Sequence, residues 1–216
     1  MDPSGPMQAI ANIWRNARSS VRDFVADRRA IAATEFAVIV PLMLVMFFGT
    51  VEFSSAVAVN RKVTMIARTL SDLTSQSTSL DPGDLQDTFT ASISMIMPYD
   101  ATLVNGTVLQ IYIDSSSVAK IKWSQSATIA NGATQATLTA PPSALVAGTT
   151  VTSMIPSTLL IPKTYLIYSE ASYLYTPSVK FVLKSGITLS DVSYTRPRQV
   201  TCVPYNGVPS LPCPLN

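Results

Sequence analysis

The hydrophobic pattern of the chain changes twice, and its first part is an almost unbroken apolar run. From Phe36 to Val59 the only charged residue is Glu52. A helix of this length rises about 36 Å, which is enough to cross a hydrocarbon core of about 30 Å. Pro41 lies within the run, and membrane helices tolerate proline better than soluble helices do. The run therefore predicts a membrane-spanning helix. The alternative, a cleaved secretory signal peptide, fits poorly because the run is too long and no Ala-x-Ala site follows it.

The second part of the pattern is periodic. Apolar residues recur at steps of four and three, which is typical of a helix that packs one narrow seam against a partner surface. The seam comprises Val59, Val63, Ile66, Leu70 and Leu73. We therefore expect one helix from about Ile31 to about Ser75. Two helices with a bend near Ser54 and Ser55 are the alternative.

Beyond residue 80 the pattern predicts a second helix and then strands. Asp81 suits an N-cap and Pro82 the first helical position, and an apolar helical face follows as far as Met97. Segments rich in β-formers come next, the first two as a hairpin, with a long surface loop between the second and the third. The strands are expected at 107–113, 118–124, 164–177 and 186–196, and the loop at 131–148.

These elements define an α+β fold with a long N-terminal transmembrane helix, a second helix and a mainly antiparallel β-sheet. We expect four segments: a basic leader (1–30), the transmembrane helix and its extension (31–78), an exported α+β domain (79–200) and a tail with prolines and cysteines (201–216). The tyrosines from Tyr165 to Tyr175 either pack within the sheet, which is the simpler reading, or form a stripe that binds a ligand.

The distribution of basic residues predicts the orientation of the membrane helix. Of the 216 residues, 47% are hydrophobic and 13% charged, which suits an exported protein attached to a membrane. Basic residues are more frequent before the apolar run than after it, which predicts a cytoplasmic N-terminus and a periplasmic C-terminal domain. The leader itself is either a basic amphipathic helix on an anionic membrane or disordered. Arginines before the run are Arg15, Arg18, Arg22, Arg28 and Arg29.

The cysteine and histidine content limits which disulfides, metal sites and catalytic groups this chain can form. Cys202 and Cys213 are the only cysteines, and in an exported domain we expect them to form a disulfide; two unpaired thiols are the alternative. Without histidine the commonest general base and metal ligand are missing. The sequence has no phosphate-binding loop and no Gly-x-Ser-x-Gly elbow, although a Ser–Lys dyad stays open. We therefore expect no enzyme, no cofactor, no metal and no nucleic-acid partner.

Two carboxylates flank the apolar run. A carboxylate that enters a bilayer is energetically costly, so Glu35 at the head of the run is a functional hypothesis by default. Its simpler role is a solvated carboxylate in the headgroup zone. Glu52, at the other end, lies either at the opposite interface or against a basic residue of a partner.

The arrangement of a basic pair, a small residue and a glutamate at the fifth position of an apolar helix resembles a type IV pilin-like signal. These residues are Arg28, Arg29, Ala30 and Glu35. Residues 33–41 together with 48–53 are similar to the TadE-like family, whose members are minor pseudopilin-type components of the tight-adherence (Tad/Flp) pilus machinery. The resemblance implies a pilin-like domain and a cut between Ala30 and Ile31 by a prepilin peptidase. The residue before the cut is usually glycine, and here it is Ala30.

The resemblance also implies partners and a location. A new N-terminus at Ile31 carries an ammonium group, which the Glu35 carboxylate of the same or a neighbouring subunit can neutralise. The protein would reside in the bacterial inner membrane and meet other pilin or pseudopilin subunits and the pilus assembly platform. The alternative function is an uncleaved single-pass anchor that presents an adhesion or sensing domain.

Overall fold

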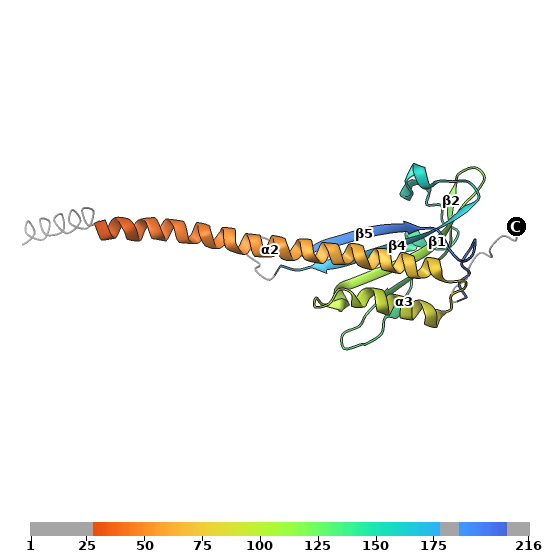
Figure 1. Ribbon diagram of the computed structural model, residues 1–216, viewed down its shortest axis with the longest axis horizontal. Coiled ribbons are helices and arrows are strands. Elements are labelled where there is room, and N and C mark those ends of the chain that lie inside the picture. The colour runs from red at the N-terminus through yellow and green to blue at the C-terminus, as the bar shows by residue number, and fades with distance from the viewer. Residues whose placement is uncertain (1–27, 178–185, 207–216) are drawn as a thin grey trace, which may run out of the picture. The chain divides into compact units, whose positions relative to one another are not determined.

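The computed structural model describes residues 28–177 and 186–206, with side chains from Ile31 onward (Figure 1). It contains two α-helices, α2 and α3, five strands, β1 to β5, and four short 3₁₀ helices, η1 to η4. The basic leader expected at residues 1–30 lies outside this range except for its last three residues. The bounds are α2 Arg28–Gln76, α3 Pro82–Ser94, η1 Ala101–Leu103, β1 Val104–Ile113, β2 Ala119–Thr128, β3 Thr137–Thr139, η2 Ser143–Leu145, η3 Thr152–Met154, η4 Ser157–Leu159, β4 Thr164–Tyr175 and β5 Ile187–Thr195.

The chain divides into two compact units, Met1–Glu52 and Phe53–Asn216. Helix α2 contributes to both. Its helical structure continues through Ser54 and Ser55, where a bend between two helices was the alternative prediction. The prediction of one helix from about Ile31 to about Ser75 is therefore confirmed at the level of secondary structure.

The second unit contains one antiparallel sheet in the order β3-β2-β1-β4-β5. Strands β1 and β2 form the predicted hairpin, whose turn is held by the Asp114 carboxylate; it accepts hydrogen bonds from the N–H groups of Ser116 and Val118. The segment expected as one long loop includes β3, because Thr137–Thr139 pairs with the outer edge of β2. The α+β fold with a mainly antiparallel sheet is confirmed.

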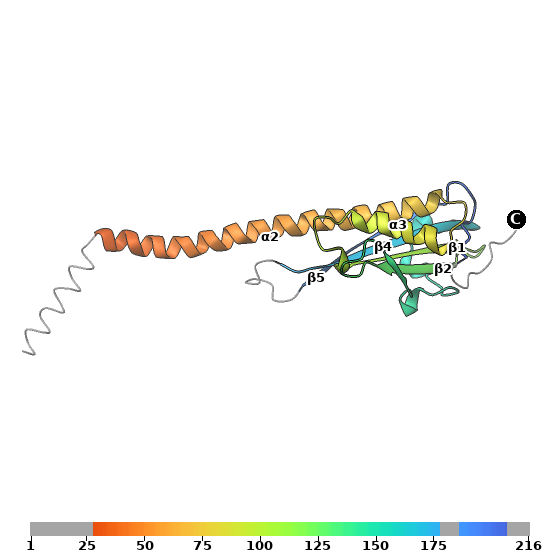
Figure 2. The same cartoon turned by 90° about the horizontal axis from the view of Figure 1, so that it is seen from below.

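One face of the sheet is covered by α3 and by residues 53–76 of α2 (Figure 2). The predicted seam of α2 is buried in this layer, with Val59, Val63, Ile66 and Leu70 fully inaccessible and Leu73 half-buried. Helix and sheet approach closely at Gly106, where a Cβ would lie 3.1 Å from Phe89 Cε1. A side chain at this position would therefore require the Phe89 ring to shift by a few tenths of an ångström.

Polar contacts fix the position of α2 along the sheet. Ser169 Oγ on β4 donates to the carbonyl oxygen of Ala67 at 2.6 Å. Two side-chain hydrogen bonds join α2 to β5, since Thr64 Oγ1 donates to Asp191 Oδ2 and the hydroxyls of Ser71 and Thr195 lie 2.7 Å apart. Because these bonds need matched partners, they specify register where apolar packing alone would tolerate sliding.

Irregular chain covers part of the opposite face. Residues 143–160, with three of the 3₁₀ helices, pack Leu145, Val151 and Ile155 against a second apolar cluster. Tyr168 of β4 belongs to this cluster, and its hydroxyl donates to Glu170 Oε2 at 3.0 Å. Burial, and then the nearby Glu170 carboxylate, raises the pKa of Tyr168. The buried tyrosines of β4 thus serve sheet packing, the simpler of the two roles expected for them.

The segment after β5 differs from the expected tail. Val203 and Tyr205 are buried, and Trp123 Nε1 of β2 donates to the carbonyl oxygen of Val203 at 2.8 Å. The rings of Trp123 and Tyr205 also pack with their centroids 5.3 Å apart. Residues 203–205 are therefore part of the core, because their apolar side chains complete the packing around Trp123.

The cap of α3 gives a test of this fold. Asp81 Oδ1 accepts from the Asp84 N–H, and Asp84 Oδ2 accepts from the Asp81 N–H, which forms a capping box. Asp81→Ala removes the cap and should lower the free energy of unfolding by about 1 kcal/mol. The measurement is denaturant unfolding of the detergent-solubilised full chain, followed by Trp123 fluorescence. Asp87→Ala, exposed on the same helix outside the capping box, is the control; an equal loss in both variants would contradict the role of the cap.

Candidate membrane anchor and assembly site

The N-terminal half of α2 exposes nearly all of its apolar side chains. From Ile31 to Val51 every side chain is exposed except that of Val40, which is half-exposed. Phe36, Val38 and Phe47 expose 69%, 73% and 62% of their surface. Soluble proteins rarely expose contiguous apolar surface of this extent, and a helix that is apolar all round belongs in a lipid or protein interior. In the part of the chain that the structure describes, α2 is the one helix long and apolar enough to span a membrane.

Two threonine hydroxyls in the N-terminal half of α2 bond back to the helix, as lipid favours. Thr34 Oγ1 donates to the carbonyl oxygen of Ile31 and Thr50 Oγ1 to that of Met46, each at 2.8 Å. Pro41 lies inside the helix and has no N–H to donate. The two threonine hydroxyls therefore add no unpaired donor to the run.

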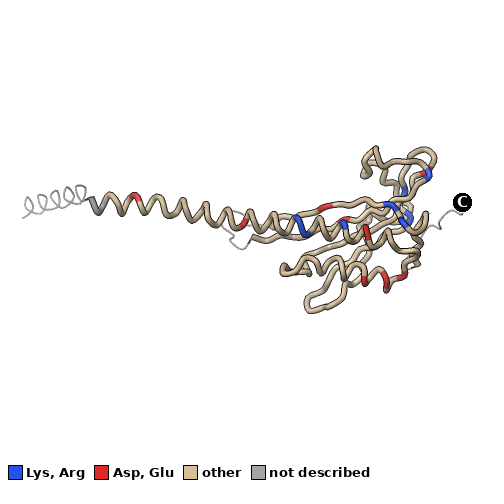
Figure 3. Tube along the Cα trace, viewed as in Figure 1, with Lys and Arg blue, Asp and Glu red and all other residues tan. Residues whose placement is uncertain are grey.

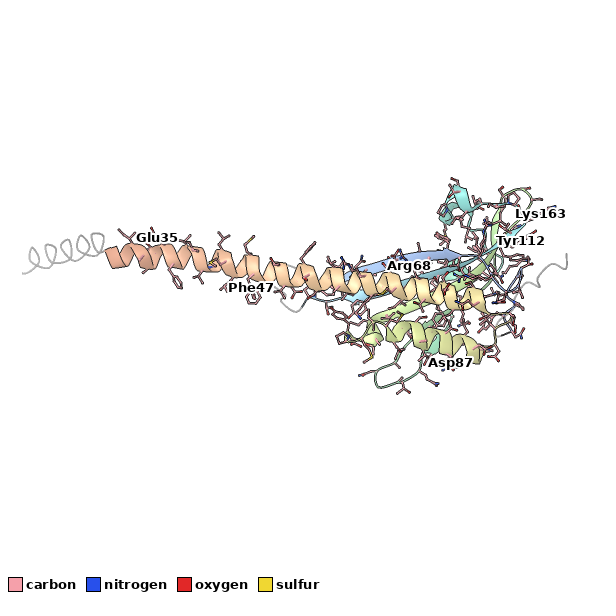
Figure 4. All side chains as sticks on the ribbon, viewed as in Figure 1. Glu35, Phe47, Arg68, Asp87, Tyr112 and Lys163 are labelled. Atoms are coloured by element: carbon pink, nitrogen blue, oxygen red, sulfur yellow. The ribbon has the colours of Figure 1, made fainter. Side chains whose placement is uncertain are left out.

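Glu35 lies at the head of this run, one helical turn after Ile31 (Figure 4). Its side chain is exposed, and it is the only carboxylate on α2 before Glu52. Four residues of helix separate Ile31 and Glu35 by about 6 Å along the axis. The geometry places a carboxylate within reach of any positive group that forms at Ile31 or that a neighbouring helix presents at this level.

The bond between Ala30 and Ile31 lies in the first turn of α2, which begins at Arg28. Side chains of Arg28, Arg29 and Ala30 are not among those described.

Glu52 lies at the other end of the run and is half-buried. Seventeen residues of helix place it about 26 Å from Glu35 along the axis, so the two carboxylates do not form one site. They instead mark the two ends of an apolar segment of nearly membrane thickness.

Cys202 lies after β5, half-buried, with its Sγ 3.7 Å from Gln110 Oε1. Cys213 lies outside the described residues, so the disulfide between them stays a prediction. Within residues 28–177 and 186–206, no group of three or more Asp, Glu or Cys side chains is arranged to hold a metal ion.

An apolar, exposed helix continuous with an α+β unit is the architecture of a membrane-anchored protein with a single span. The family model of TadE-like proteins matches residues 30–70, which include the predicted cut, Glu35 and the apolar run. The resemblance to the TadE-like family is therefore confirmed over this segment, and it associates the chain with the Tad pilus system. No curated protein and no solved structure matches the chain.

The anchor can be tested with a charge in the middle of the run. Leu44→Arg should reduce the fraction of protein integrated in membranes, because arginine at the centre of a membrane helix costs about 2.5–3.5 kcal/mol on insertion scales. The measurement is vesicle flotation after alkaline extraction. Met65→Arg is the control, since Met65 is similarly exposed on α2 but lies beyond the apolar run. Equal integration of both variants would argue against a membrane span at 36–58.

Proposed function

We propose that the protein is an inner-membrane, pseudopilin-like component that assists assembly of a Tad/Flp pilus and thereby surface adherence. The observation that carries the proposal is the position of Glu35 at the head of an exposed apolar helix, inside the segment that matches the TadE-like family. The role is structural: the chain acts through helix contacts, without catalysis, cofactor or nucleic acid.

In this proposal a prepilin peptidase cuts between Ala30 and Ile31 on the cytoplasmic side. The new ammonium group at Ile31 then lies one turn from the carboxylate of Glu35, or meets that of a neighbouring subunit. An ion pair enters the low-dielectric interior at much lower cost than either charge alone, whereas one unpaired charge there is strongly unfavourable. Pairing between subunits would therefore fix the axial register of one helix against the next.

The exposed side chains of the apolar run supply the contact surface for such partners. Phe47 and Phe48 form an edge-to-face pair with centroids 5.5 Å apart, and both remain exposed. Association of helices in lipid relies on packing and polar pairing, since lipid tails are as apolar as the side chains. Other pilin or pseudopilin subunits and the assembly platform are the partners that fit this surface.

The proposed topology has the leader in the cytoplasm and the α+β unit in the periplasm. Arg28 and Arg29, directly before the run, favour retention of this end on the cytoplasmic side. An oxidising periplasm would also permit the predicted disulfide between Cys202 and Cys213.

The role of Glu35 gives the main test. Glu35→Gln removes the charge at nearly constant size and should strongly reduce pilus number, since removal of one partner from a shielded ion pair costs about 3–5 kcal/mol. Pili are counted by electron microscopy in cells without the wild-type copy, and membrane levels of the protein are compared in parallel. Glu35→Asp keeps the charge and should restore part of the piliation. Normal piliation in Glu35→Gln would contradict the assembly role.

Processing gives a separate test. Mass spectrometry of the protein extracted from membranes should find an N-terminus at Ile31, because the peptidase cut precedes assembly. Ala30→Gly, which installs the usual residue, should be processed at least as fully, whereas a bulky Ala30→Leu should retain the leader. An intact leader in the wild-type protein would overturn the cut and favour the uncleaved adhesion or sensing anchor.

A further inference from the structure

Exposed apolar side chains gather at one end of the unit Phe53–Asn216. We call this surface the apolar end; its residues are Phe53, Val57, Met95, Met97, Leu174 and Ile187. Each exposes between 36% and 72% of its surface, and Met97 exposes 68%. They come from α2, the turn after α3, β4 and β5, so no single sequence pattern predicts the cluster.

The fold brings these residues to one end for definable reasons. Lys62 Nζ of α2 donates to the carbonyl oxygens of Met95 at 3.0 Å and Met97 at 2.6 Å, which fixes the end of α3 beside the start of this part of α2. The register of the sheet places Leu174 opposite Thr188 and Tyr175 opposite Ile187, where β4 ends and β5 begins. In both views, the end of α3, the end of β4 and the start of β5 lie at the same end of the sheet (Figures 1 and 2).

Charge is sparse in the described segments of the apolar end; residues 178–185, which contain Lys180 and Lys184, lie outside the described range. The described segments are 53–58, 95–103, 128–135, 174–177 and 186–188, and Asp100 is the only Asp, Glu, Lys or Arg among them. The Asp100 carboxylate accepts from both the N–H and the hydroxyl of Thr102, and these bonds hold its pKa below the usual value.

The opposite end of the same sheet carries more charge, because charged residues gather at the turn between β1 and β2, at the start of β4 and after β5 (Figure 3), although Val146, Met154 and Ile161 are also exposed there. These residues are Asp114, Lys120, Lys122, Lys163, Arg196 and Arg198.

We propose that the apolar end is a lipid-binding surface that rests in the headgroup region of the membrane that the same chain enters. The apolar run of α2 ends within this surface, at Phe53 and Val57, so the surface is continuous with the segment proposed to span the bilayer. Arg61 is exposed two turns after Phe53 and lies at a level suited to anionic headgroups.

Flexible methionines and a few large apolar side chains on a surface with few described charges match the chemistry of an interfacial, monotopic contact. Such a contact would hold the α+β unit against the membrane before assembly, and it rests on the membrane span proposed above.

The test uses the full chain reconstituted in vesicles of phosphatidylcholine and phosphatidylglycerol. In a Trp14→Phe background, Met97→Trp places a fluorophore at the apolar end, and buried Trp123 supplies a constant signal. The matched control is Met154→Trp, since Met154 is exposed to 39% and lies near the charged end, where Val151 bonds to Ala119 at the start of β2. Both substitutions replace an exposed methionine, and equal denaturation midpoints will verify that both fold.

Lipid brominated near the top of its acyl chains quenches tryptophans that reach the headgroup boundary. The added emission from position 97 should fall by about half, whereas that from position 154 should be unchanged, because interfacial residues lie within about 5–10 Å of this boundary. Equal quenching at both positions, or none at position 97, would overturn the lipid surface. A blue shift at position 97 without quenching would also overturn it, in favour of a protein partner. Failure of the protein to float with the vesicles would overturn the membrane span itself, which separates the two claims.

Discussion

The burial of one stripe of α2 against the sheet is the interaction on which the rest of the structure depends. Val59, Val63 and Ile66 lie fully inside this layer, while the residues before Phe53 expose apolar side chains on all sides. One part of this helix therefore packs against a protein core, and the other part, in our proposal, lies in lipid. Because the same helical backbone satisfies its own hydrogen bonds in both, no loop is needed between them.

The charged residues of α2 are placed differently in its apolar part and in the part that packs on the sheet. Glu35 directly precedes the apolar run, Glu52 is the single charge within it, and Arg61 and Arg68 lie where one face of the helix packs on the sheet. Polar side chains in that part also specify register, since Thr64 and Ser71 hydrogen-bond to β5.

The apolar end adds a second membrane-directed feature to the same unit. The described part of this end has few charges and the other end of the sheet has many, so the sheet differs in charge from one end to the other (Figure 3). In the proposed pilus component, this difference in charge would keep the α+β unit at the membrane until subunit contacts replace lipid contacts.

The sequence by itself determined the local and periodic features. The apolar run, the seam of α2, the Asp81 cap and the strands of the sheet follow from patterns within a few turns of chain, as does the resemblance around Glu35. Only the tertiary structure decided that Val203 and Tyr205 belong to the core around Trp123, that Thr137–Thr139 extends the sheet, and that Met97 and Leu174 share one end. These outcomes depend on contacts between residues far apart in the chain, and hydrophobic periodicity carries no information about which distant surface a segment meets.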